Sequence, residues 1–567
     1  MLATIALWIY IILLPLIYGR AFKRLLAGML REKPLVPLVL TWLLGITVIT
    51  TLASFLSIIM PVARTTHLLI LAGGLGILIA NWKNNYFAAR KGLRNLRKVH
   101  GLVLLIGLVA VITTLEIATR VPSNPDSGQY HAQAIRWIET YRAVPGLGNL
   151  LTRFAFNSSW FVTSAVFSLA FLGGRSFHLV PSALFLCVVF YSLTGIDQLL
   201  KKQLRFSALF RALLIPLAFN FLPAEVSSPG TDLPVTLIAW VLIAEWIRVL
   251  EQKEEDHLVL STILWAAAAF CVTIKLSAVA LLLGGAIIML TRQNPHKRDY
   301  LLLNLGLAAV IALPWLIRNV ILSGYLVYPF PAIDLFQVDW KIPLVNALSD
   351  MHSIQTWAKV PGSDLAKLTD LPLSLWFPEW WADQTLFRKL ILLVVIAAPF
   401  LYTLPAVIPW KGRKKAWEQA IAFLPLYAFV YAGLAFWFFT SPGFRFGMGF
   451  ILPALLLALI PPLLWAINRF KKLVVPSIVV LALAILGYQL FTLAFSLDFR
   501  TLRERALLPA DYPHLPSEPC RMRNTTVLTP SADAWMACWY LPFPCTPHCE
   551  AGVELRGDSL QDGFRWP

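Results

Sequence analysis

The segment Arg120-Val-Pro-Ser-Asn-Pro-Asp126-Ser-Gly-Gln-Tyr130-His131 opens a polar region that continues to Trp160 in an otherwise apolar chain. It begins where a long apolar run, Gly101–Ala118, ends. Polar side chains kept in such density at the end of an apolar run usually mark a functional site in a membrane protein. The segment therefore predicts a fold of membrane-crossing helices and a site at the end of one of them.

The composition agrees with a membrane protein. Of the 567 residues, 58% are hydrophobic and 14% are charged, whereas a soluble protein carries roughly 25% charged residues. The net charge is +18. Most Lys and Arg fall in short loops between apolar runs, as in cytoplasmic loops of membrane proteins, so we expect no nucleic-acid partner. The first apolar run, Leu2–Tyr18, has no Lys or Arg before it, which favours a first span over a cleaved signal peptide.

Apolar runs recur to about residue 495 and predict an all-α polytopic bundle of about 13–15 spans. The basic loops place Lys83–His100 inside and Asp126 outside. Two runs, Trp160–Gly173 and His178–Ile196, conflict with the charge pattern if both cross the membrane. We therefore expect one of these two to be short, re-entrant or tilted.

The chain divides into three predicted parts. Residues 1–100 form N-terminal helices with basic cytoplasmic loops, and residues 101–497 form a transmembrane core. That core has two outer loops, at 119–158 and at 319–388, and the second is rich in Trp and Pro. Residues 498–567 form a polar, Pro-containing tail outside the cytoplasm.

An amphipathic helix is predicted inside the polar region. Tyr130, Ala134, Trp137 and Tyr141 recur at helical spacing. The segment is too short and too charged to cross a membrane, so we expect it to lie along the membrane interface.

The tail holds four of the six cysteines: Cys520, Cys538, Cys545 and Cys549. An even set of cysteines in an extracytoplasmic segment predicts two disulfides, with three connectivities possible. A zinc site that uses Cys545, His548 and Cys549 is the alternative. Cys187 and Cys271 lie in apolar runs and are expected to be packed thiols.

The predicted topology brings acids and cations to the outer side of the membrane. Asp126 and Asp232 are the acids, and Lys275, Arg318 and Arg445 are the cations. A carboxylate beside several cations suits a reaction in which a hydroxyl attacks and a phosphate leaves. Each residue also has a structural interpretation. The acids could cap helices, Lys275 could extend toward the interface, and the arginines could be interfacial anchors.

The same residues lie in motifs that resemble the GT-C superfamily of integral-membrane glycosyltransferases. The motifs are Asp126-Ser-Gly-Gln-Tyr130-His131, Ser228-Pro-Gly-Thr-Asp232-Leu-Pro234, Thr273-Ile-Lys275-Leu-Ser277, Pro314-Trp315-Leu-Ile-Arg318-Asn319, Tyr328-Pro329 and Ser441-Pro442-Gly-Phe-Arg445-Phe446. The likeness covers roughly Gly101–Phe495. Asp126 is followed by Ser, so the paired acid of some members is absent.

The resemblance implies a bacterial enzyme of the inner membrane, with its active site facing the exterior, that uses a polyprenyl-phosphate-linked sugar. Asp126 would be the catalytic base and Asp232 a second catalytic acid. Lys275, Arg318 and Arg445 would bind the donor phosphate. The remaining candidates for substrate contacts are Tyr130, His131, Trp315 and Tyr328.

The acceptor implied is a glycolipid, a cell-envelope polysaccharide or a protein, and a divalent metal is left open. Two alternatives remain at this point. One is a polymerase or ligase of lipid-pyrophosphate-linked glycans, and the other is a lipid or solute transporter, which would place charges deep within its spans.

Overall fold

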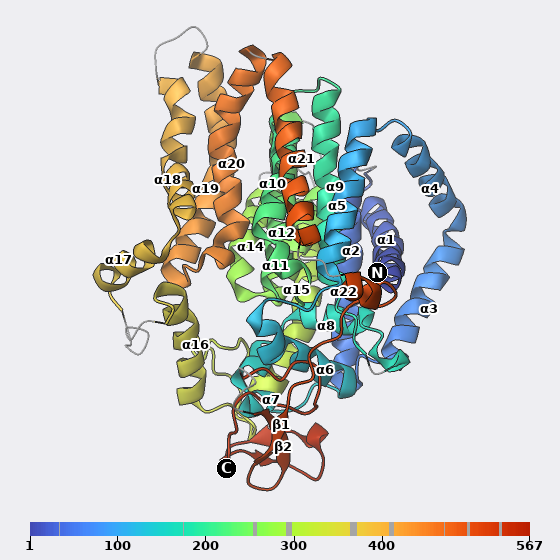
Figure 1. Cartoon of the computed structure of the whole chain (residues 1–567), viewed down its shortest axis with the longest axis vertical. Helices are drawn as coiled ribbons and strands as arrows, with labels where there is room; N and C mark the ends of the chain where they lie inside the picture. The colour runs from blue at the N-terminus through green and yellow to red at the C-terminus, as the bar shows by residue number, and fades with distance from the viewer. Residues whose placement is uncertain are drawn as a thin grey trace.

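The computed structural model describes residues 1–32, 35–173, 175–252, 258–290, 297–362, 371–407, 413–469, 471–495, 499–531 and 536–567. The predicted boundary between core and tail at 497/498 lies outside the described residues. Most of the described chain is helical, and the long helices run roughly along the longest axis of the molecule (Figure 1). The C-terminal tail packs at one end of the bundle (Figure 1).

The first half of the chain contributes helices on both sides of the polar region. They are α1 (Leu2–Met29), α2 (Leu38–Ile59), α3 (Arg64–Ala80), α4 (Trp82–Leu96), α5 (Gly101–Ala118), η1 (Ser127–His131), α6 (Ala132–Thr140), α7 (Leu147–Leu150), η2 (Thr152–Phe156), α8 (Ser159–Phe167), η3 (Ala170–Leu172), α9 (Val180–Leu200), α10 (Phe206–Phe221), α11 (Pro223–Val226), α12 (Asp232–Gln252) and α13 (Leu258–Ile274).

The second half completes the bundle and adds the tail. Its elements are η4 (Leu276–Ala278), α14 (Val279–Leu290), α15 (Lys297–Ser323), α16 (Leu344–Lys359), α17 (Leu373–Asp383), α18 (Leu386–Val407), α19 (Arg413–Thr440), α20 (Phe444–Arg469), α21 (Lys471–Phe495), α22 (Phe499–Arg505), β1 (Ser517–Arg521), β2 (Thr526–Pro530), β3 (Glu554–Leu555), η7 (Leu560–Asp562) and β4 (Phe564–Arg565).

Eight helices among the described residues are long and apolar enough to cross a membrane. They are α1, α2, α5, α9, α12, α15, α19 and α20, and the bent pair α3–α4 makes a ninth if it is one span. Five shorter apolar helices accompany them. The apolar helices indicate a membrane protein, while the predicted count of about 13–15 spans stays a prediction.

One local expectation about the bundle is met, and the break at Lys275 is also seen. The run that begins at Trp160 forms α8, a helix of nine residues, which is shorter than the roughly 20 residues of a span. This is the predicted short segment, and α9 follows it as a full-length helix. Lys275 lies at the break between α13 and η4, where its backbone is extended, with φ −153° and ψ 128°.

The helix of the polar region does not lie open on a membrane surface as expected. It begins as η1, a π-helix, and continues as α6, whose residues are almost all buried. The tail covers it: the Trp137 ring meets Phe543 and Phe564 with centroids 4.9 and 6.0 Å away. The apolar face of the predicted helix is therefore buried. It packs against the tail and does not face the membrane interface as expected.

The tail itself is built from two small antiparallel sheets, β1–β2 and β3–β4. The two predicted disulfides are present, as Cys520–Cys549 and Cys538–Cys545. This connectivity leaves neither Cys545 nor Cys549 as a thiolate for zinc. Among the described residues, no group of three or more His, Cys, Asp and Glu side chains is arranged to hold a metal ion.

The two disulfides should differ in their effect on the tail. Cys520–Cys549 spans 29 residues and Cys538–Cys545 spans 7. In the chain-entropy account, removing the longer link costs about 3–4 kcal/mol and removing the shorter one about 2 kcal/mol. We expect C520A/C549A to lower the tail's protection from protease more than C538A/C545A does, as measured by limited proteolysis of the purified protein. Equal protection in both variants would contradict this order.

Candidate functional site

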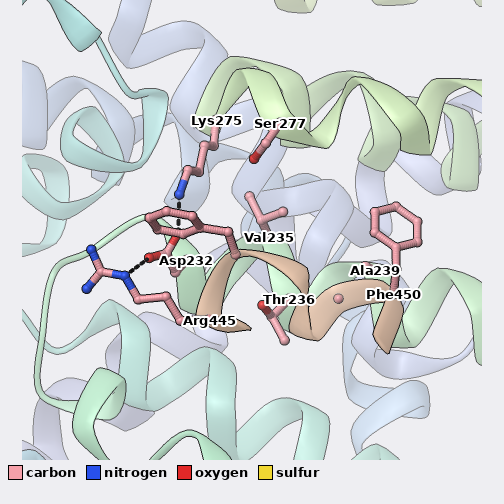
Figure 2. A pocket seen from close by; sticks show the side chains of 10 residues that line it. Asp232, Val235, Thr236, Ala239, Lys275, Ser277, Arg445 and Phe450 are labelled. Atoms are coloured by element: carbon pink, nitrogen blue, oxygen red, sulfur yellow. Dashed lines mark hydrogen bonds and ion pairs between the residues drawn. The ribbon is translucent and has the colours of Figure 1, made fainter. Parts of the chain in front are cut away.

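Four charged side chains from four distant segments form one chain of ion pairs. The Arg445 Nη2 atom donates to the Asp126 Oδ2 atom at 2.8 Å. The Arg445 Nε atom lies 3.5 Å from the Asp232 Oδ2 atom, and the Lys275 ammonium pairs with the other Asp232 oxygen (Figure 2). The order along the chain of pairs is Asp126, Arg445, Asp232 and Lys275, which we call the charge relay.

Each member of the charge relay stands at an end of a helix. Asp126 immediately precedes η1, and its backbone N–H donates to the Asn124 Oδ1 atom at 3.0 Å. Asp232 opens α12, where a carboxylate is favoured by the helix dipole. Lys275 occupies the break after α13, and Arg445 lies in the first turn of α20. A π-helix such as η1 is rare and is frequently found at functional sites.

The Phe446 ring lies against both cations of the relay. The Lys275 Nζ atom is 4.0 Å from the ring centroid, and the Arg445 guanidinium carbon is 4.9 Å from it. Cations attracted to a ring face keep a defined position without a further acid. Phe446 therefore holds the cationic side of the relay in place.

A small hollow with about 320 Å³ of empty space opens beside the relay (Figure 2). Asp232, Lys275 and Arg445 form its charged side. The rest of its lining comes from α12, η4 and α20: Val235, Thr236, Ala239, Ser277, Phe446, Gly449 and Phe450. The hollow thus joins a charged rim to a mostly apolar floor.

A second hollow, with about 230 Å³ of empty space, lies further along α12, and we call the apolar residues that line the two hollows the apolar path. Leu242 and Trp246 line the second hollow and follow Asp232, Val235 and Ala239 at helical spacing. The opposite wall is Leu281, Gly284 and Gly285 of α14 with Phe429 of α19. Both hollows therefore lie along α12, and the second is lined by apolar residues only.

The electrostatic surroundings of Asp126 keep it ionised. Burial alone would raise the pKa of its carboxyl, but the nearby His131 and Arg445 outweigh burial, and the pKa lies below its usual value. Burial lowers the pKa of His131 to about 4, so His131 is neutral near pH 7. At neutral pH the guanidinium of Arg445, followed by that of Arg153, therefore keeps the pKa of Asp126 low.

Tyr130 and His131 lie beside the relay. The two rings pack edge to face with centroids 4.3 Å apart. The Arg153 guanidinium carbon lies 5.7 Å from the Tyr130 centroid. Burial and the charge of Asp126 raise the pKa of Tyr130. The His131 Nδ1 atom is buried and has no hydrogen-bond partner.

The structure separates the remaining predicted site residues from the relay. The Arg318 side chain is buried and donates to the Asn157 Oδ1 atom at 2.9 Å and to the Ser57 Oγ atom at 2.7 Å. The Trp315 carbonyl accepts from the Asn157 amide at 2.9 Å. The Tyr328 hydroxyl donates to the Asp350 Oδ2 atom at 3.2 Å.

Glu225 of α11 is a third acid of the site that the sequence analysis did not select. Its Oε2 atom accepts from the Asn124 amide at 2.8 Å, two residues before Asp126. Burial, followed by the charge of Asp232, raises the pKa of Glu225 to about 6. Its sequence context, Pro-Ala-Glu-Val, carries no recognisable motif; only its place in the loop before Asp232 pointed to the site.

The Cys538–Cys545 loop of the tail packs against η1. The Trp539 backbone N–H donates to the Gly128 carbonyl at 2.8 Å. A Cβ atom on Gly128 would come within 2.8 Å of the Trp539 ring, so only glycine permits this approach. The tail therefore contacts the segment that carries Asp126.

Residues 1–452 match the family model described as a domain of unknown function (DUF8201). Because this match covers most of the 567 residues, the chain belongs to that family. No curated protein and no solved structure matches the chain. The matched region contains all four members of the charge relay and ends before the tail.

The raised pKa of Glu225 predicts a pH-dependent stability. The ordinary pKa of 4.5 applies in the unfolded chain and about 6 in the fold. The unfolded state therefore holds fewer protons between these values, and stability falls as pH rises through that window, by about 2 kcal/mol in all. We expect Glu225→Gln to be more stable than wild type at pH 7.5, with the gain vanishing near pH 4.5.

Thermal unfolding of the detergent-solubilised protein at both pH values measures this difference. Glu518→Gln, in an exposed part of β1, is the matched control and should show no such dependence. A Glu225→Gln variant that is destabilised equally at both pH values would contradict the assignment.

Proposed function

We propose that the protein transfers a sugar from a polyprenyl-phosphate-linked donor to a hydroxyl of an acceptor on the outer face of the inner membrane of a bacterium. The observation that carries this proposal is the charge relay beside the apolar path along α12. A donor of this class has a charged phosphate joined to a long hydrocarbon, and both parts find a complementary surface there. The resemblance of the ordered motifs to GT-C glycosyltransferases supports the same reaction.

Lys275 and Arg445 are the groups proposed to bind the donor phosphate. Both line the hollow, and Phe446 orients both. Arg and Lys donors stabilise phosphate oxygens through charge-assisted hydrogen bonds, and the same contacts strengthen as negative charge develops on a leaving phosphate. Arg318 is not included, because its donors are directed to Asn157 and Ser57.

The hydrocarbon of the donor is proposed to follow the apolar path. Gly284 lies against the Phe429 ring and Gly285 against Trp265, so these two positions let aromatic rings form part of the lining. Trp246 and Phe429 offer flat apolar surfaces at its far end. Burying an alkyl chain there contributes roughly 0.8 kcal/mol per CH₂ group relative to water, although lipid offers a competing apolar environment.

Asp126 is the proposed general base. In the transfer step the acceptor hydroxyl oxygen forms a bond to the anomeric carbon of the sugar, and the carboxylate of Asp126 takes the hydroxyl proton. The bond between the anomeric carbon and the phosphate oxygen breaks, and the phosphate leaves with the electron pair. Displacement from the opposite face inverts the anomeric centre. Throughout the reaction, the proposed role of Asp232 is to position Lys275 and Arg445 beside the donor phosphate through its two ion pairs.

In the ligand-free relay, Asp126 is bound to Arg445 and is therefore a weak base. A phosphate that binds to Arg445 competes with this carboxylate. Because the pKa of Asp126 is depressed mainly by that guanidinium at neutral pH, donor binding would raise its basicity. The proposed reaction therefore has the donor bind before Asp126 accepts a proton.

The central prediction concerns Asp126→Asn and Arg445→Ala. Asn keeps the size of the side chain but cannot accept the proton, so we expect transfer to fall by roughly 10²–10⁴-fold with donor binding largely retained. Arg445→Ala should weaken donor binding as well as turnover, because the phosphate contact exists in the ground state too. The measurement is sugar transfer and donor binding with purified protein and a panel of polyprenyl-phosphate sugars.

Asp334→Asn is the matched control, because Asp334 pairs with Lys341 in the outer loop away from the relay. It should retain normal turnover. If Asp126 is only a helix cap, its substitution costs about 1 kcal/mol of stability and leaves activity near normal. Retention of more than about a tenth of wild-type turnover by Asp126→Asn would rule it out as the base.

A further inference from the structure

Helix α4 (Trp82–Leu96) combines an apolar stripe with a strongly basic face. Trp82, Tyr86, Ala89, Leu93 and Leu96 recur at spacings of three and four, so they share one side of the helix. The segment 82–98 contains six Lys and Arg residues and no Asp or Glu. The six are Lys83, Arg90, Lys91, Arg94, Arg97 and Lys98.

The side chains of the apolar stripe of α4 are exposed on the surface of the isolated chain. Trp82 is 61% exposed, Tyr86 54%, Leu93 66% and Leu96 54%. In Figure 1, α3 and α4 lie at the margin of the molecule beside α1. Within the described part of α4, Asn85 is the one buried residue.

The geometry at the start of α4 is fixed. The axis turns by 84° between α3 and α4. At the turn, the Arg24 guanidinium of α1 donates to the Asn81 Oδ1 atom at 2.5 Å and to the Asn85 Oδ1 atom at 3.3 Å. The turn sets α4 off the line of α3, so the two helices do not continue as one straight span.

Among the residues that the structure describes, the acids nearest α4 are few and are already engaged. Glu32 is the sole acid in residues 1–115, and its carboxylate accepts the backbone N–H groups of Leu258 and Val259. At the far end of α4, Asp197 pairs with Lys201 and accepts the His100 N–H. Arg20 and Lys23 of α1 add positive charge near Arg24. The basic face of α4 therefore lacks an acidic partner among these neighbours.

The position of α4 along the bundle is opposite to the candidate site. Helix α5 begins five residues after α4 and ends eight residues before Asp126. Its 18 residues extend about 27 Å, close to the thickness of the hydrocarbon core. If the site faces the outside, α4 lies at the cytoplasmic surface, where anionic lipids give a negative potential.

We propose that α4 is a binding site for anionic phospholipid headgroups at the cytoplasmic surface of the membrane. Its aromatic and leucine stripe enters the boundary between headgroups and acyl chains, and its Lys and Arg residues contact lipid phosphates. This arrangement is the one that basic amphipathic helices adopt at anionic interfaces. The proposal rests on the chain spanning a membrane with its basic loops on the cytoplasmic side, and it does not depend on the glycosyltransferase assignment.

The first experiment measures lipid affinity. Delipidated full-length protein in detergent is titrated with phosphatidylglycerol or with phosphatidylethanolamine, and bound lipids are counted by native mass spectrometry. We expect a preference for phosphatidylglycerol, and R90Q/K91Q/R94Q should weaken it by about tenfold or more. The matched control K202Q/R205Q/R298Q removes three exposed cations from the loop after α9 and the first turn of α15, and it should leave the preference unchanged.

The second experiment locates the apolar stripe. An environment-sensitive fluorophore is attached at Leu93→Cys in a C187A/C271A background, and the protein is placed in phosphatidylglycerol nanodiscs that carry spin-labelled acyl chains. Quenching of the fluorophore, and its loss in R90Q/K91Q/R94Q, are expected. A fluorophore that stays unquenched shows that α4 faces solvent or a protein partner and overturns the proposal. Equal loss of lipid affinity in R90Q/K91Q/R94Q and in its control also overturns the proposal, because the loss would then not depend on the cations of α4.

Discussion

The arrangement of this molecule depends on keeping two carboxylates and two cations together in a partly buried place. Asp126, Arg445, Asp232 and Lys275 come from segments that are far apart in sequence, and their charges cancel in pairs. A buried charge that loses its partner costs several kcal/mol. The ends of α12, α13 and α20 must therefore meet beside η1. The relay thereby orients a charged rim at the start of the apolar path along α12.

The tail adds a second constraint on the same place. It covers α6, and the loop closed by Cys538–Cys545 donates a hydrogen bond from Trp539 to Gly128 in η1. Glu139 of α6 is buried and accepts the Tyr540 hydroxyl at 2.6 Å. Burial raises the pKa of Glu139. Its ionised form is costly to bury, and the hydrogen bond from Tyr540 offsets part of that cost. A tail that lies outside the matched family region thus supports the segment that carries Asp126.

The sequence predicted those features that depend on local chemistry. Apolar runs indicated the helices, paired cysteines indicated two disulfides, and helix-end charges indicated the relay. It did not distinguish Arg318 from Arg445, because both follow an apolar run and only packing decides that one reaches Asn157 and the other Asp126. Glu225 was missed for the same reason, since its relation to Asn124 spans about a hundred residues. The amphipathic pattern of α6 marked a buried face without identifying the tail as its cover.

A self-paired relay has a consequence for the proposed chemistry. An unpaired Asp126 would activate water whenever a donor was bound. Without a donor, it would exchange its proton with the solvent. Paired with Arg445, it is held as a carboxylate of low basicity until another anion takes the guanidinium. Glu225, whose pKa is raised to about 6, lies in the same electrostatic environment and takes up a proton before Asp126 does. Protonation there removes one negative charge near the rim, which favours the approach of an anionic phosphate. Binding of an anion at the rim is therefore coupled to the charge states of Asp126 and Glu225.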